Sequence, residues 1–100
     1  MKKSFKKLDN TVIRALTNAC EIAKDWDCGF EWLTHTADYN QFPESLMVTC
    51  VFSSEEDIAR VREQNIELKL HQLIAFNLSA EQIVLKNVSK HIRFVADEPC

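Results

Sequence analysis

Leu46-Met-Val-Thr-Cys-Val-Phe52 decides how the rest of this 100-residue chain can fold. Apolar side chains recur there at every second position, which is the period of a strand with one buried face. The members of that apolar set are Leu46, Val48, Cys50 and Phe52. β-Branched and aromatic residues, which strands favour, are also abundant. We therefore predict a strand over residues 46–52, with Phe52 in the core.

A partner strand is predicted just before it, over Phe30–Tyr39, because the two-residue period appears there too. One face would carry Phe30, Trp32, Thr34 and Thr36, and the other would carry Glu31, Leu33, His35, Ala37 and Tyr39. We expect Trp32 to be buried together with Phe30. Residues 40–45 include Pro43, which interrupts a ladder, so this segment is expected to be a loop. Two strands joined by so short a loop pair in antiparallel orientation.

Helical periodicity flanks this strand pair. Residues 11–26 repeat apolar side chains at three- and four-residue steps, with Asp9 or Asn10 as the cap. Gly29, the only glycine, suits the exit from that helix. A second helix is predicted from Ser53, which has capping-box spacing with Glu56. Its buried stripe consists of Ile58, Val61, Ile66, Leu70, Leu73 and Ile74.

The end of the chain completes the order of elements. Residues 79–85 fit either a short helix or a strand, whereas His91–Ala96 alternates as a strand does. The order is α-β-β-α-(α or β)-β, which predicts an α+β two-layer sandwich with two helices on one face of a small sheet. Residues 1–100 form one domain. Residues 1–7 are expected to be a flexible basic tail, and residues 97–100 an acidic C-terminal tail.

Charge is distributed unevenly along the chain. Four of its twelve basic residues lie in the first seven positions, whereas all fifteen acidic residues come later. Contact with nucleic acid through the tail is therefore one hypothesis. Its residues would be Lys2, Lys3, Lys6 and Lys7. The rest of the chain has no strongly basic face of the kind that nucleic-acid binders show.

The sequence predicts a cytoplasmic protein with reduced thiols. The basic start is not followed by the apolar segment of a signal peptide, and no run approaches the eighteen apolar residues of a membrane span. Cysteines in that compartment are rarely paired in disulfides. Cys20 and Cys50 fall on apolar stripes and are expected in the core, whereas Cys28 and Cys100 are expected to be exposed. Whether either exposed thiol is reactive is left open.

No motif in the sequence carries catalytic or metal chemistry. The chain contains neither C-x₂-C nor H-x₃-H spacing, nor a G-x-S-x-G or H-E-x-x-H pattern. One glycine is too few for a phosphate-cradling loop. We therefore predict that the protein is not an enzyme and uses no metal or cofactor.

A sheet covered on one face leaves its second face and one edge for binding. The candidate interaction surface consists of Leu33, His35, Tyr39, Met47, Val51 and Val95. So many large side chains on one face suggest a homodimer that buries about 1,000 Å² or more, with another protein as the alternative partner. The sequence thus favours a non-catalytic binding or regulatory module that acts through protein–protein contacts.

Gly29–His35, Phe42–Phe52 and His91–Phe94 resemble a family of small uncharacterised bacterial proteins, and the likeness covers most of the chain. Some of its members are labelled Fis-type transcriptional regulators. Fis-like proteins end in a basic helix-turn-helix, whereas this chain ends in a predicted strand and an acidic tail. The resemblance implies a bacterial origin and assigns no site residues.

The order of elements is also similar to type II KH domains and BolA-like proteins. KH domains clamp nucleic acid with a G-x-x-G loop, which this chain does not have. BolA-like proteins place a ligand histidine at the start of the last strand, where His91 stands here. By analogy of topology alone, a cofactor-assisted role through His91 is a further alternative.

Overall fold

A computed structural model describes the backbone of residues 3–97 and the side chains of residues 6–97. The elements are α1 (Lys3–Lys24), β1 (Phe30–Thr36), η1 (Tyr39–Gln41), β2 (Met47–Phe52), α2 (Glu55–Glu63), α3 (Ile66–Ala80), η2 (Val88–His91) and β3 (Ile92–Ala96). This order, α-β-β-α-α-β, and the α+β class confirm the predicted architecture. Lys2 and Cys100 lie outside the described residues.

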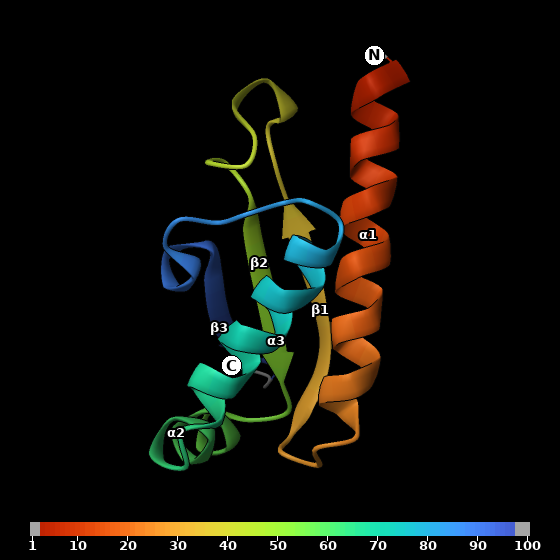
Figure 1. The fold of residues 1–100 in the computed structure, drawn as a ribbon. Coiled ribbons are helices and arrows are strands. Elements are labelled where there is room, and N and C mark those ends of the chain that lie inside the picture. Colours follow the sequence, from red (N-terminus) through yellow and green to blue (C-terminus); the bar gives the residue numbers. More distant parts are fainter. Residues whose placement is uncertain (1–2, 98–100) are drawn as a thin grey trace.

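The sheet has the order β1-β2-β3, with β2 in the centre. β1 pairs with β2 in antiparallel orientation, and β2 pairs with β3 in parallel orientation. A parallel pair requires a long crossover, which α2 and α3 provide. Figure 1 shows α3 in front of the sheet and α1 next to it on the β1 side, and the two helices contact each other.

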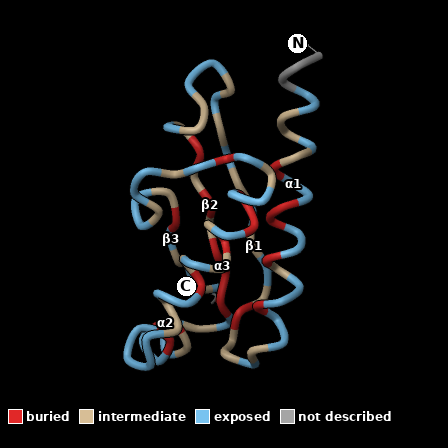
Figure 2. Tube along the Cα trace, viewed as in Figure 1, coloured by how far each residue is buried: buried red, intermediate tan, exposed pale blue. Residues whose placement is uncertain are grey.

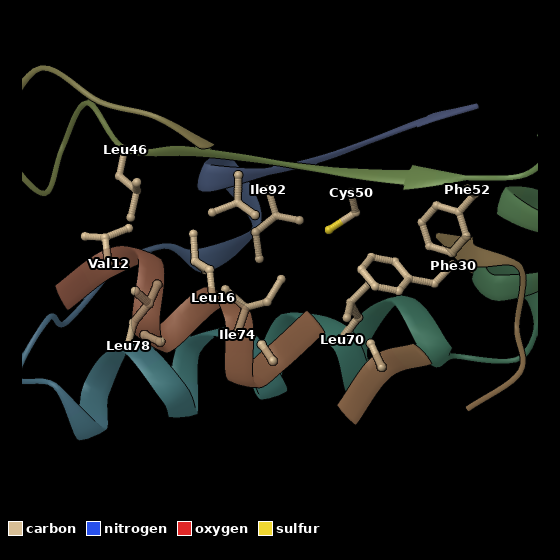
Figure 3. Close-up of a cluster of buried hydrophobic side chains, with 14 of the residues drawn as sticks. Val12, Leu16, Phe30, Leu46, Cys50, Phe52, Leu70, Ile74, Leu78 and Ile92 are labelled. Atoms are coloured by element: carbon tan, nitrogen blue, oxygen red, sulfur yellow. The ribbon is translucent and has the colours of Figure 1, made fainter. Parts of the chain in front are cut away.

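The core lies between one face of the sheet and the two helices. Figure 3 shows side chains of β2 and β3 pointing toward those of α1 and α3. The largest fully buried ones are Phe52, Leu16, Leu46, Leu70, Ile74 and Leu78. In Figure 2 the buried positions of α1 follow one side of the helix, as its three- and four-residue apolar spacing predicts.

The helices begin and end at different places from those predicted. α1 starts at Lys3, so residues 3–7 are helical in the structure, and their predicted flexibility stays a prediction. The buried stripe of α1 begins with Leu8, which lies one turn before Val12 and packs against the core. The third helix arises because the predicted second helix breaks at Asn65, which has φ 60°. Residues 81–87 after α3 form neither helix nor strand.

The cap of α2 lies one residue later than predicted. Ser54, not Ser53, is the N-cap, and its hydroxyl accepts a hydrogen bond from the backbone N–H of Asp57 at 3.1 Å. The Ser53 hydroxyl instead donates to the Asp57 carboxylate. That carboxylate lies directly beneath Gly29, so the start of α2 and the turn before β1 are packed together.

Candidate functional site

A β-bulge near the start of β1 decides which side chains reach each face of the sheet. Phe30 pairs with Phe52 and Trp32 pairs with Val51, so two steps along β1 match one step along β2. An extra residue of this kind shifts the alternation by one position. Phe30 is therefore buried against the helices, whereas Trp32 points to the opposite face and is 44% exposed. The prediction that Trp32 lies in the core is wrong for this reason.

The face of the sheet away from α1 and α3 is the first candidate surface, and we call it the open face. The row nearest the end of β2 runs across all three strands through Trp32, Val51 and Val95. Val95 is 38% exposed, whereas Val51 between its neighbours is only 7% exposed. The next rows contain Thr34, Thr49 and Arg93, then Thr36 and Met47. Met47, Val51 and Val95 thus share the open face as predicted, although Val51 is largely buried.

Leu33 and His35 lie on the other side of β1, because they pair with the core residues Cys50 and Val48. The prediction that they share a face with Val51 is wrong, and the bulge is again the cause. Tyr39 is also removed from the open face, since it lies in η1, beyond the end of β1. The six predicted interaction residues therefore divide into two groups.

Asp9, His35 and Tyr39 form a polar cluster that joins α1 to β1 and η1. His35 Nε2 lies 3.2 Å from Asp9 Oδ1, and the Tyr39 hydroxyl donates to the same oxygen. The hydrogen bonds from Tyr39 and then from His35 hold the pKa of Asp9 below its usual value. Burial, followed by the bond to Asp9, raises the pKa of Tyr39. The cluster is arranged as a clamp between elements.

The Asp9 clamp predicts a pH-dependent contribution to stability. A carboxyl whose pKa is lowered by folding stabilises the fold above its unfolded pKa of about 4, and this contribution is lost as the pH falls through the folded pKa. Asp9 is 40% exposed, so the effect is expected to be about 1 kcal/mol or less. In urea melts, Asp9→Asn should be less stable than the wild type at pH 7, with the difference shrinking toward pH 2.5. A difference independent of pH would contradict this account.

A groove of about 360 Å³ separates α1 from β1. Leu16 is buried and Cys20 and Leu33 are half-buried in its wall, while Ile13 and Thr17 are exposed along it. Thr34, His35, Glu21 and Lys24 also line it. We call this feature the α1–β1 groove. No local pattern in the sequence indicated it, because the bulge is needed to turn Leu33 and His35 toward α1.

The three described thiols, Cys20, Cys28 and Cys50, lie in or beside the core. Cys50 is buried as predicted, whereas Cys20 is half-buried against the core. Burial, with a smaller contribution from nearby Cys20, raises the pKa of the Cys50 thiol to about 12, so it is a poor nucleophile. Cys28 was expected to be exposed but is half-buried against the core. Within residues 3–97, no group of three or more His, Cys, Asp or Glu side chains is arranged to hold a metal ion.

The sequence offered two other candidates: the N-terminal lysines for nucleic-acid contact, and His91 for a cofactor-assisted role. Lys6 and Lys7 are exposed on α1 beside a hollow of about 420 Å³ that Arg14 also lines. Arg14 is paired with Glu81 at 3.0 Å, so its own positive charge is already engaged within the chain. His91 Nδ1 lies 2.7 Å from the Leu46 carbonyl oxygen and donates to it. Nucleic-acid contact and a role for His91 both stay predictions.

Comparison with known proteins identifies no relative of this chain. No family model, curated protein or solved structure matches the chain. In the described part of the chain, no helix combines the length and apolar character needed to cross a membrane. The function is therefore inferred from the open face, the Asp9 cluster and the α1–β1 groove.

Proposed function

We propose that this protein is a non-catalytic binding or regulatory module that acts through protein–protein contacts on the open face of its sheet. The observation that carries the proposal is the row of Trp32, Val51 and Val95 across three strands, with its outer members exposed. Single exposed apolar residues are ordinary, whereas contiguous ones mark binding surfaces. Tryptophan is also enriched among the residues that dominate binding energy.

The polar groups of the molecule support binding better than catalysis. The Asp9 carboxylate is engaged by both His35 and Tyr39, and the most buried thiol is held in its protonated form. The Arg93 guanidinium on the open face donates to the Thr49 hydroxyl at 2.8 Å. This pair gives the apolar row a polar border, which is the usual arrangement of a protein interface.

The size of the open face limits how tightly a second copy can bind. Strands about 4.8 Å apart with a rise of about 3.3 Å per residue give this face an area of roughly 250 Å². Two copies packed face to face would bury about 500 Å² in total, well below the 1,200–2,000 Å² of stable interfaces. The predicted homodimer interface of about 1,000 Å² therefore needs contacts beyond this face, and self-association through the face alone should be weak.

Trp32→Ser is expected to weaken self-association at least tenfold, because it removes the largest exposed side chain of the open face. Sedimentation equilibrium between about 10 μM and 1 mM measures the effect. Phe76→Ser is the matched control, since Phe76 is a 73% exposed aromatic on α3, away from the open face. This control should associate as the wild type does.

A wild-type chain that remains monomeric at 1 mM would exclude a second copy as the partner. Binding of other proteins to the open face is then tested directly. Immobilised wild type, Trp32→Ser and Phe76→Ser chains are compared for the proteins that they retain from a native extract. Identical sets for all three would contradict binding through this face.

A further inference from the structure

We propose that the α1–β1 groove binds an extended peptide segment of another protein, which adds to the free edge of β1 as a fourth strand. The inference deepens the proposed function as a protein-binding module, but it uses a different surface from the open face. It stands on three observations: the unpaired edge of β1, the groove that follows this edge, and the position of α1.

The edge of β1 offers backbone hydrogen-bonding groups to a partner. In the described sheet β1 has one neighbour, β2, so its other side takes no part in a ladder. Edge strands of this kind pair readily with an added strand, whose backbone supplies affinity and whose alternate side chains supply specificity. The seven residues of β1 span about 23 Å, enough to pair with five or six residues of a peptide.

The lining of the groove shows that it reaches this edge. Thr34 points to the open face, whereas Leu33 and His35 point to the helix side, yet all three line the same groove. A hollow that passes the edge of the strand takes its lining from both faces in this way. A strand added there would turn every second side chain toward Leu16 and Cys20 of α1. The volume of about 360 Å³ lies in the range of small-ligand pockets and suits a few apolar side chains.

The position of α1 favours a peptide over a second copy of the chain. Figure 1 shows α1 beside β1, on the side away from β2. If β1 paired with β1 of a second copy, the α1 helix of that copy would need the space that α1 already occupies. An extended segment carries no helix layer and can enter beneath α1. The open face alone is also too small for a stable dimer, so a partner that uses the edge extends the available contact area.

The groups around the groove define the chemistry of the peptide. Its inward positions should be apolar, matching Leu16, Cys20 and Leu33, and its paired residues should not include proline, which cannot donate to a ladder. Glu31 stands on β1 two residues before Leu33, outside the lining of the groove, and one of its carboxylate oxygens is shielded from solvent with no hydrogen-bond partner among the described residues. A lysine or arginine at the end of the peptide that extends past Leu33 toward Glu31 is therefore favoured.

The test is a selection from a random twelve-residue peptide library displayed on phage, with the full chain as bait. The wild type should enrich segments with apolar residues at alternating positions. Thr17→Trp, which fills the groove, should not enrich them. Asn18→Trp is the matched control, because Asn18 is also exposed on α1 but does not line the groove. In fluorescence anisotropy, a selected peptide should bind Thr17→Trp at least tenfold more weakly than the wild type, and Asn18→Trp within about twofold.

Amide chemical shifts locate the bound peptide and confirm that each variant is folded. Changes are expected along β1 and the groove side of α1, from Ile13 to Glu21. Equal enrichment by the wild type and Thr17→Trp, or no enrichment by either, would overturn the proposal.

Val95→Lys separates this inference from the proposed function, because Val95 lies on the open face at the opposite edge of the sheet. If peptide binding is retained in Thr17→Trp and lost in Val95→Lys, the groove proposal is wrong and the proposed function of the open face is supported. If the peptide binds through the groove while protein partners bind Val95→Lys and Trp32→Ser as they bind the wild type, the groove proposal is supported and the proposed function of the open face is wrong.

Discussion

Phe52→Ala is expected to lower the free energy of unfolding by about 3–5 kcal/mol. Phe52 is fully buried at the end of the central strand β2. Its ring centroid lies 5.7 Å from that of Phe30 and 5.0 Å from that of Phe94, so it joins both neighbouring strands. Truncation to alanine removes the apolar burial and leaves a cavity that these rings cannot close. Domains of this size are stable by about 5–15 kcal/mol in total, so the loss would be a large share.

Urea denaturation followed by tryptophan fluorescence and circular dichroism measures this loss. Phe76→Ala provides the control, since the same truncation at a 73% exposed site on α3 should cost less than about 0.5 kcal/mol. A loss below about 1 kcal/mol for Phe52→Ala would show that the faces of β2 are assigned the wrong way round.

Gly29→Ala is expected to cost about 2–4 kcal/mol, an unusually large effect for adding one methyl group. Gly29 has φ 89°, where a Cβ atom alone costs about 1–2 kcal/mol. The added Cβ would also lie 2.4 Å from Cγ of Asp57, so the carboxylate must move. That displacement breaks the hydrogen bonds that Asp57 accepts from Ser53, Ser54 and Arg60. The turn before β1 and the start of α2 would be disturbed together.

A double-mutant cycle with Asp57→Gly tests this contact. Asp57→Gly removes Cβ, Cγ and Oδ2, the three atoms that would lie 2.4 to 2.6 Å from the new methyl group. Gly29→Ala should therefore cost less in the Asp57→Gly background than in the wild type. Additive effects of the two substitutions would contradict the close approach.

Asn65→Gly, at a φ of 60° in the break between α2 and α3, should be neutral or slightly stabilising, because glycine relieves the left-handed backbone there.

The sequence predicted the elements well because their signals are local. The alternation of β2 identified its buried side, and the same period placed Met47, Val51 and Val95 on one face. The failures come from β1. Its alternation is interrupted between Phe30 and Trp32, and no glycine or proline marks the interruption. A period argument assumes an unbroken strand, so one extra residue reversed every later assignment on β1.

The Asp9 cluster could not be predicted for a different reason. Asp9 stands where a helix cap would stand, and the local pattern was interpreted that way. Its partners His35 and Tyr39 are 26 and 30 positions away in the chain, and they meet it only after α1 packs beside β1. The break at Asn65 was missed as well, since no glycine, proline or side-chain cap accompanies it. Asparagine tolerates this left-handed conformation, so the residue type was the one local signal at the break.

The bulge in β1 has a consequence for how relatives of this protein would be aligned. A homologue that lacks residue 31 would pair without a bulge, with its tryptophan still opposite Val51 and its histidine still opposite Val48. A homologue that keeps all these residues but pairs them regularly would instead carry the tryptophan into the core and the histidine away from Asp9. A one-residue gap at this point of an alignment therefore joins proteins with the same surfaces, whereas a gapless alignment can join proteins with different ones.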